Sequence, residues 1–230
     1  MKVSLQHFDP SRFSFHNDPI LVIEDFWTTD ERRHFLEAMR ARTWRSLEEM
    51  PHVRTAFPNC GNWAKADMGQ SEVGRFLDRL SISCIHEYLE SFPNVTGRGM
   101  SFHYYSYGVG DCLLTHDDSV QAYPSPETSP TPSSLRRLAL ITYLHDDWQA
   151  DWGGELILYT TRSQPGSDRP RLTISHCIAP EPGSLVLFTV PRFHRVCRVD
   201  PMSGDHRRLS IAGWLMTEHA FALDETHPAA

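Results

Sequence analysis

The sequence predicts a mainly β protein with flanking helices, in which the strands form a jelly roll or a small barrel. Helical patterns are confined to the part of the chain before about residue 98. After that point, short apolar segments alternate with turns rich in Gly and Pro, which is typical of all-β sandwiches and barrels. Strands are expected at residues 100–107, 111–116, 136–145, 154–160, 171–178, 184–190, 194–199 and 207–217.

The N-terminal region is expected to support these strands with helices. Residues 20–23 (Ile-Leu-Val-Ile) are a short strand of buried type, and residues 28–31 (Thr-Thr-Asp-Glu) form a capping box. The helix that begins there should end near Arg42. A second helix is predicted over residues 70–92, where apolar residues recur at helical spacing. Residues 43–68 carry no regular pattern and are expected to be irregular.

Length and composition indicate one domain over residues 1–230, with about 1–98 as helical support and about 99–217 as the jelly-roll core. The net charge of −7 argues against a nucleic-acid partner, which usually meets a basic face. No segment resembles a signal peptide or a membrane span. The five cysteines form no Cys-x-x-Cys pair, so we expect reduced thiols in a cytoplasmic protein. Nothing in the sequence favours one oligomeric state.

Three residues have the types and the positions of an open metal site. His116 and Asp118 follow an apolar segment two residues apart, and side chains at that spacing on a strand point to the same side. His194 follows another apolar strand and would supply the third ligand from across the barrel. Two imidazoles and one carboxylate leave coordination positions open, which favours a catalytic Fe(II) over a closed structural zinc.

The His-x-Asp pattern alone is weak, because a chain with 13 histidines contains it by chance. It occurs at His7/Asp9, His16/Asp18, His116/Asp118 and His145/Asp147. The first two pairs have no strand signal before them. The pair His145/Asp147 also follows an apolar segment and remains an alternative metal-ligand pair. It begins an acidic, Trp-containing segment whose composition is typical of a loop.

Arg208 stands on the apolar strand 208–214 and needs an anionic partner, because an unpaired buried charge is costly. A dicarboxylate cosubstrate could supply that partner through a bidentate pair. Ser210 lies on the same face and can add a hydroxyl group. Arg207 should point the opposite way, to solvent.

Together these segments resemble the Fe(II)- and 2-oxoglutarate-dependent oxygenases. The resemblance is carried by residues 110–118, by residues 136–144 with 152–156, and by residues 208–214. It is strongest for the prolyl hydroxylase branch, especially the catalytic domain of the ribosomal-protein prolyl hydroxylases, and extends over about residues 20–217. It implies a double-stranded β-helix, the cupin-like form of the jelly roll.

The resemblance implies that His116, Asp118 and His194 hold Fe(II) and that Arg208 holds 2-oxoglutarate. Tyr143 matches a tyrosine that reaches the same distal carboxylate in hypoxia-type prolyl hydroxylases; a core aromatic is the alternative reading. The cosubstrates would be 2-oxoglutarate and O2, with ascorbate as a candidate reductant. In the halogenating relatives a small residue replaces the carboxylate, so Asp118 favours hydroxylation.

The substrate pocket is expected to include Arg136 and Trp214, which match positions at the substrate entrance of the same branch. A surface cation and a core tryptophan are the alternatives for these two residues. Tyr105 is a further candidate for the pocket lining. The Pro/Ser/Thr-rich insert at residues 123–134 is either a lid over the pocket or a plain surface loop.

The implied reaction hydroxylates an unactivated C–H bond, with release of succinate and CO2. The expected substrate is a prolyl residue of a peptide or protein, or a proline- or amino-acid-like molecule, since the insert and a long turn after His194 lie near the entrance. A natural-product oxygenase and a non-catalytic jelly-roll binding module are alternatives. A nucleic-acid demethylase of the same superfamily would carry a second arginine where Trp214 stands, and a zinc hydrolase would need His-Glu-x-x-His.

Overall fold

The computed structural model describes residues 2–9, 14–15, 17–119, 135–163, 166 and 170–218, and the insert at residues 123–134 lies outside these ranges. The large sheet has the order β1-β2-β10-β7-β12-β5-β4-β3, and the small sheet has the order β6-β11-β8-β9. The strands of the large sheet are β1 (Lys2–Val3), β2 (Ile20–Ile23), β10 (Leu185–Thr189), β7 (Leu135–Tyr143), β12 (Arg208–Thr217), β5 (Val95–Tyr107), β4 (Ala64–Asp67) and β3 (Arg45–Ser46). Those of the small sheet are β6 (Leu113–His116), β11 (His194–Val196), β8 (Leu156–Arg162) and β9 (Arg171–Ile178). The predicted jelly roll with flanking helices is confirmed.

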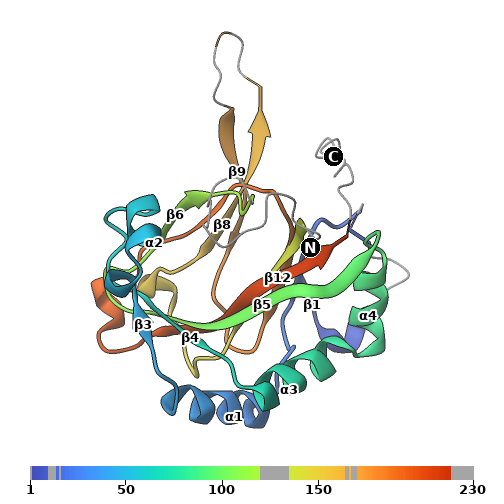
Figure 1. Cartoon of the computed structure of the whole chain (residues 1–230), viewed down its shortest axis with the longest axis horizontal. Coiled ribbons are helices and arrows are strands. Elements are labelled where there is room, and N and C mark those ends of the chain that lie inside the picture. The colour runs from blue at the N-terminus through green and yellow to red at the C-terminus, as the bar shows by residue number, and fades with distance from the viewer. Residues whose placement is uncertain are drawn as a thin grey trace.

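Helices at residues 29–40, 70–80 and 83–90 cover one side of the large sheet, and the small sheet covers the other (Figure 1). The helices are α1 (Thr29–Arg40), α2 (Pro51–Ala56), α3 (Gln70–Leu80) and α4 (Ser83–Glu90), with short 3-10 turns at Leu5–His7, Leu47–Glu49, Ala150–Trp152 and Pro201–Ser203. The predicted capping box begins α1: the Glu31 amide donates to the Thr28 hydroxyl (3.2 Å), and the Thr28 amide donates to the Glu31 carboxylate (2.9 Å).

The single helix predicted over residues 70–92 is wrong, because the chain forms two helices there. Helix α3 ends at Leu80, and Ile82 adopts an extended conformation (ψ 131°) before α4 begins. The hydroxyl of Ser81 donates to the Leu77 carbonyl (2.8 Å), a side-chain bond that competes with the continuing helix. A β-branched isoleucine between two serines adds little helix propensity to oppose the break.

Strand alternation divides the interior into two packed layers. On β7, Leu138 and Leu140 pack against the helices, whereas Ala139, Ile141 and Tyr143 face the small sheet. The same alternation on β12 separates its odd-numbered residues, which join the helix-facing core, from its even-numbered residues, which face the space between the sheets. The interior between the two sheets is therefore where the polar even-numbered residues of β12 gather.

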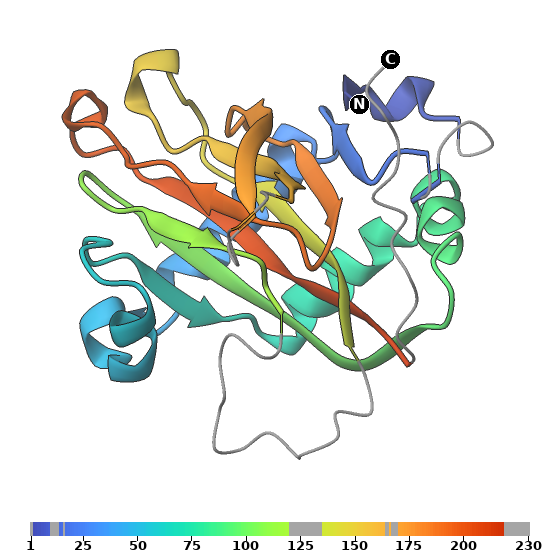
Figure 2. The same cartoon turned by 90° about the horizontal axis from the view of Figure 1, so that it is seen from above.

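The region predicted to be irregular, residues 43–68, contains β3, β4 and α2. Strand β4 pairs with β5, and β5 runs beside β12, so these strands lie side by side in both views (Figures 1 and 2). Phe57 and Trp63 from this region join a third cluster of buried residues with Tyr107 and Val196. The N-terminal region thus closes one end of the jelly roll and does not only support it from behind.

No helix in the described part of the chain is long and apolar enough to cross a bilayer. All five cysteines are free, and two of them, Cys60 and Cys112, are buried.

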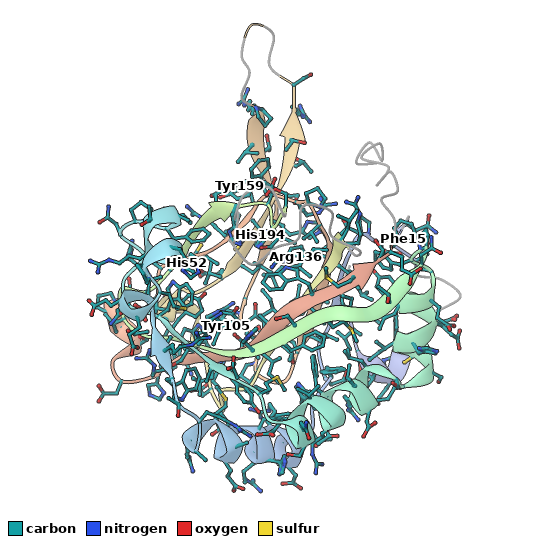
Figure 3. All side chains as sticks on the ribbon, viewed as in Figure 1. Phe15, His52, Tyr105, Arg136, Tyr159 and His194 are labelled. Atoms are coloured by element: carbon teal, nitrogen blue, oxygen red, sulfur yellow. The ribbon has the colours of Figure 1, made fainter. Side chains whose placement is uncertain are left out.

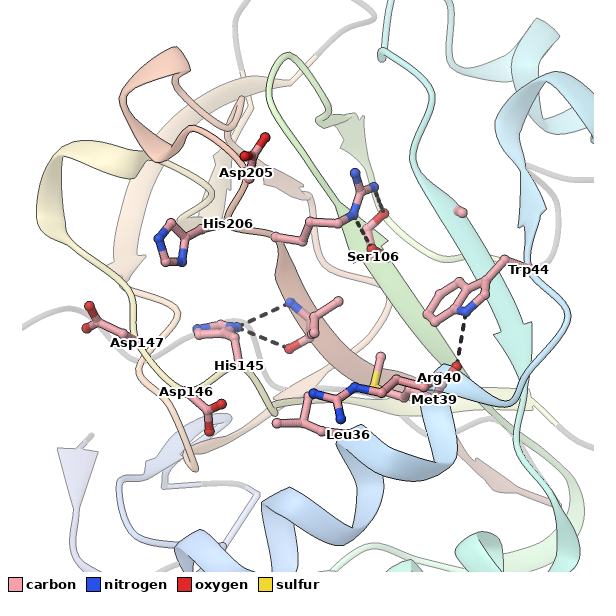
Figure 4. Close-up of a pocket in the computed structure, with 13 residues that line it drawn as sticks. Leu36, Met39, Arg40, Trp44, Ser106, His145, Asp146, Asp147, Asp205 and His206 are labelled. Atoms are coloured by element: carbon pink, nitrogen blue, oxygen red, sulfur yellow. Dashed lines mark hydrogen bonds between the residues drawn. The ribbon is translucent and has the colours of Figure 1, made fainter.

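His145, the competing ligand candidate, is a structural residue. Its Nε2 lies 2.7 Å from the Pro180 carbonyl, and its Nδ1 accepts a hydrogen bond from the Leu209 amide at 3.2 Å (Figure 4). Both ring nitrogens are therefore occupied by backbone groups on the helix side of the large sheet, and Asp147 is exposed. Burial lowers the pKa of His145 to about 4, so the ring is neutral at pH 7.

This burial predicts an acid-sensitive fold. The folded-state pKa of His145 lies below its ordinary 6.5, so the unfolded chain binds more protons and stability falls as the pH drops from about 6.5 toward 4. At pH 5 the loss from this residue should be on the order of 2 kcal/mol relative to pH 7.5. Urea unfolding at the two pH values, on the wild type and on His145→Gln, measures it. A pH dependence equal in both proteins would contradict the assignment.

Candidate metal centre and cosubstrate pocket

Two adjacent strands of the small sheet bring the histidines together. Strand β6 ends at His116, β11 begins at His194, and these two residues are direct partners in the antiparallel pairing. Their ring centroids lie 4.1 Å apart. The expectation that His194 reaches the site from across the barrel is therefore wrong: it stands on the strand next to His116.

Asp118 reaches the same point through a turn and not through the strand pleat. Strand β6 has ended two residues earlier, and Asp118 adopts a left-handed conformation (φ 61°), which few residues other than glycine adopt. Its Oδ1 lies 3.4 Å from Nε2 of His116, and its Oδ2 lies 3.4 Å from Nε2 of His194. Strand alternation therefore does not explain the position of Asp118, which depends on the left-handed turn after β6.

Backbone carbonyls fix the orientation of both imidazoles. Nδ1 of His116 lies 2.8 Å from the Leu114 carbonyl, and Nδ1 of His194 lies 2.8 Å from the Arg192 carbonyl. A carbonyl can only accept, so each Nδ1 carries the proton and each Nε2 offers its lone pair to the centre. Burial lowers the pKa of His194 to about 4, which keeps this ring neutral and able to bind a metal at pH 7.

The carboxylate of Asp118 is ionised and held from two sides. Burial by itself would raise the pKa of Asp118, but His116, His194 and the indole N–H of Trp214 outweigh it and hold the pKa well below its usual range. Trp214, on β12 of the large sheet, donates its indole N–H to Oδ2 of Asp118 at 2.8 Å. One indole therefore links the large sheet to the ligand cluster in the small one.

The three donors can meet at a single ion. Their ligand atoms all lie within 4.8 Å of one another, and within the described residues no other group of His, Cys, Asp and Glu side chains comes as close. Two atoms that each bind an ion at about 2.1 Å can be up to ~4.2 Å apart, which the two 3.4 Å separations satisfy. A set of two imidazoles and one carboxylate leaves coordination positions for other ligands.

Next to the triad, the structure buries a cation that has no counter-ion. Arg208 is 1% exposed and forms no ion pair among the described residues. Its Nη2 donates to the Tyr143 hydroxyl at 3.3 Å, while its Nε and the hydroxyl of Ser210 are buried without a hydrogen-bond partner. A carboxylate would satisfy these groups, so the residues fit the distal end of a dicarboxylate. Arg207 points to the opposite face and donates to the Ser106 hydroxyl.

A cavity of about 670 Å³ contains the triad and Arg208. The three residues expected to line the substrate pocket, Tyr105, Arg136 and Trp214, all line it. In Figure 3, Arg136 and His52 lie on either side of His194, with Tyr105 below. The further lining residues that sequence reasoning missed include His52, Phe57, Trp63, Lys65 and Tyr107, of which the first four fall in the region predicted to be irregular.

Comparisons with known proteins agree with this geometry. A family model described as the 2OG-Fe(II) oxygenase superfamily matches residues 100–216. The chain is 36% identical over 110 residues to the prolyl 3-hydroxylase OGFOD1 of Mus musculus, a match that covers 47% of this chain and 17% of the relative. The chain therefore spans less than a fifth of that relative's length.

Two solved structures share the fold. A prolyl hydroxylase from Trichoplax adhaerens, in complex with a hypoxia inducible factor peptide fragment, has a TM-score of 0.56 at 19% identity and covers 93% of this chain and 90% of its own. A Pseudomonas putida prolyl-4-hydroxylase has a TM-score of 0.54 at 18% identity, over 88% of this chain and 95% of its own. With the family model matching 100–216, about half of the chain, this protein belongs to the 2OG-Fe(II) oxygenase superfamily.

Proposed function

We propose that this protein is an Fe(II)- and 2-oxoglutarate-dependent dioxygenase that hydroxylates a prolyl residue of a peptide or protein, or a proline-like substrate. The observation that carries the proposal is the buried guanidinium of Arg208, which has no counter-ion among the described residues and lies in one cavity with the triad. The proline preference is supported by the names of the relatives, which include a prolyl 3-hydroxylase and a prolyl-4-hydroxylase. A small natural product remains the second candidate substrate.

In this proposal His116, Asp118 and His194 hold the iron. The distal carboxylate of 2-oxoglutarate pairs with Arg208 and receives a hydrogen bond from Ser210. When bound, iron, 2-oxoglutarate and O2 supply the oxidising chemistry and yield succinate and CO2, with ascorbate as the candidate reductant that keeps iron ferrous. The protein's own contribution is to orient these groups and to exclude water from them.

Tyr143 is suited to act as a second donor to that carboxylate. Burial raises the pKa of its hydroxyl, which therefore keeps its proton at pH 7. Because Arg208 already donates to the oxygen of this hydroxyl, the hydroxyl proton is free to point to another acceptor. A guanidinium and a phenol on neighbouring strands thus converge on one anionic group.

The alternatives of other classes are less well supported. A non-catalytic binding module could lose any one member of the site, yet the triad, Arg208, Tyr143 and Ser210 are all in place. A demethylase-like second arginine is replaced by Trp214, whose indole is committed to Asp118. The carboxylate at residue 118 favours hydroxylation over halogenation.

The proposal predicts a visible metal-to-ligand charge-transfer band when Fe(II) and 2-oxoglutarate are added anaerobically to the metal-free protein. His194→Ala should abolish the band, because one of three ligands is lost. Arg208→Ala should raise the 2-oxoglutarate concentration needed for half-maximal absorbance by at least tenfold, since a buried charged pair is removed. Absorbance titration measures both effects.

Arg207→Ala is the matched control for that titration, because Arg207 is the neighbouring arginine on the opposite face. It should leave the 2-oxoglutarate affinity within about twofold of the wild type, as surface changes usually do. A folded wild-type protein without the band, or equal losses in Arg207→Ala and Arg208→Ala, would refute the proposed cosubstrate.

A separate prediction concerns the indole that holds Asp118. Trp214→Phe keeps an aromatic ring but removes the N–H donor at 2.8 Å, so Fe(II) affinity should fall about tenfold. The Fe(II) concentration needed for half-maximal absorbance at saturating 2-oxoglutarate reports it. Trp148→Phe removes an indole that donates to the Gly153 carbonyl instead, and it should leave Fe(II) affinity unchanged. Equal affinities in the two variants would mean that Trp214 does not position the ligand.

A further inference from the structure

The cavity carries more positive charge than the triad and the cosubstrate require. Besides Arg208, it is lined by Lys65 and Arg136, whereas Asp118 is the one carboxylate among its described lining residues. That carboxylate is already committed to two histidines and Trp214. Lys65 and Arg136 are therefore without a counter-ion among the described lining residues.

Lys65 faces the cavity from β4. It is paired with Tyr105 on β5, which in turn is paired with Ser210 on β12, so the three side chains stand in one row on the same face of the large sheet. The Lys65 ammonium group is half-buried and forms no ion pair within 4.0 Å among the described residues. Burial lowers the pKa of Lys65 because it disfavours the charged ammonium form. A bound anion would stabilise that charged form.

Asp67, the acid nearest to Lys65 in sequence, forms no ion pair with it within 4.0 Å. Asp67 lies outside the cavity lining, and its side chain is 75% exposed. Its Oδ1 is 3.4 Å from Nε2 of His103 and 4.0 Å from Nη2 of Arg45. The Asp67 carboxylate, at the C-terminal end of β4, therefore lies close to His103 and Arg45.

Arg136 is the second unpaired cation. Its guanidinium carbon lies 3.8 Å from the centroid of the Trp214 ring, and no carboxylate lies within 4.0 Å among the described residues. The same indole binds Asp118, so a single ring separates this guanidinium from the ligand cluster. A guanidinium stacked on an indole stays fixed in direction while its N–H groups remain free for a carboxylate.

We propose that the substrate carries a carboxylate, bound in the part of the cavity that Lys65 and Arg136 make positive, and that its nitrogen is acylated as in a peptide. The proposal rests on the function proposed above and specifies its substrate class. The ammonium group of a free amino acid would find no available acid, because Asp118 is the single carboxylate among the described lining residues and is engaged. The carboxylate is either the C-terminal group of the prolyl unit or an acidic side chain next to it.

Matched ligands separate these possibilities. N-acetyl-L-proline and N-acetyl-L-prolinamide differ only in the carboxylate, and L-proline adds a free ammonium group. The capped peptides acetyl-Gly-Pro-Glu-amide and acetyl-Gly-Pro-Gln-amide move the charge to a side chain. Calorimetric titration of the anaerobic protein loaded with Fe(II) and 2-oxoglutarate gives the Kd for each. We expect one of the two acidic ligands to bind at least tenfold more tightly than its uncharged partner, and N-acetyl-L-proline to bind more tightly than L-proline.

The variants Lys65→Met and Arg136→Met test the residues, since methionine keeps an apolar side chain of similar length. At least one of them should weaken the preferred acidic ligand at least tenfold, and both should leave its uncharged partner within twofold. The control is Arg45→Met, which removes an exposed cation of the neighbouring strand that does not line the cavity. It should leave every Kd unchanged. Circular dichroism checks that each variant is folded.

The inference is overturned if the amides bind as tightly as the acids, if L-proline binds as tightly as its N-acetyl form, or if the Lys65 and Arg136 variants retain the preference. It is also overturned if none of these ligands binds. The proposed function has a separate readout, the charge-transfer band with 2-oxoglutarate, which does not depend on Lys65 or Arg136. A normal band with no carboxylate preference would therefore refute this inference alone.

Discussion

The buried charge of Arg208 is the constraint on which the site depends. A guanidinium that is 1% exposed can be kept in a folded protein only if the surrounding structure supplies partners for it or for its ligand. Strand β12 meets this requirement by lying between β5 and β7, so that Tyr107 and Tyr143 flank the guanidinium with their rings (5.4 and 4.8 Å to the ring centroids). The alternate residues of the same strand, such as Ile211, pack in the helix-facing core. Strand β12 thus packs into the hydrophobic core with one face and lines the site with the other.

The metal ligands depend on contact between the two sheets. His116 and His194 belong to the small sheet and are held by their cross-strand pairing and by their own backbone carbonyls. Asp118 lies beyond the end of its strand and takes its orientation from an indole of the large sheet. Any change in the separation of the sheets would therefore move the carboxylate relative to the histidines. The apolar layer between the sheets, which includes Phe188 against the His194 ring at 4.9 Å, keeps that separation fixed.

Local signals in the sequence predicted much of the fold, and non-local contacts account for what they missed. The capping box at Thr28 and the strands at residues 20–23 and 171–178 were found because their patterns are complete within a few residues. Strands β3 and β4 are short and lack an apolar pattern of their own; β4 pairs with β5, and β3 pairs with β4. His145 looked like a ligand because its partners, the Pro180 and Leu209 backbones, are remote in sequence. For the same reason Lys65 was missed, although Arg208 and the triad could be named from their residue types.

The charge of the cavity is opposite in sign to that of the chain, and this difference bears on selectivity. The chain carries a formal net charge of −7, yet the described residues that line the cavity include Lys65, Arg136 and Arg208 and one engaged carboxylate. At physiological ionic strength exposed charges are screened beyond roughly 8 Å, so the acidic surface contributes little inside a half-enclosed cavity. There, cations that are half-buried interact more strongly with an arriving carboxylate than they would in water. A polyanion would meet the unfavourable surface along its whole length, whereas one short acidic segment would meet only the cations. The acidic net charge of the chain is therefore compatible with the anionic substrate proposed above.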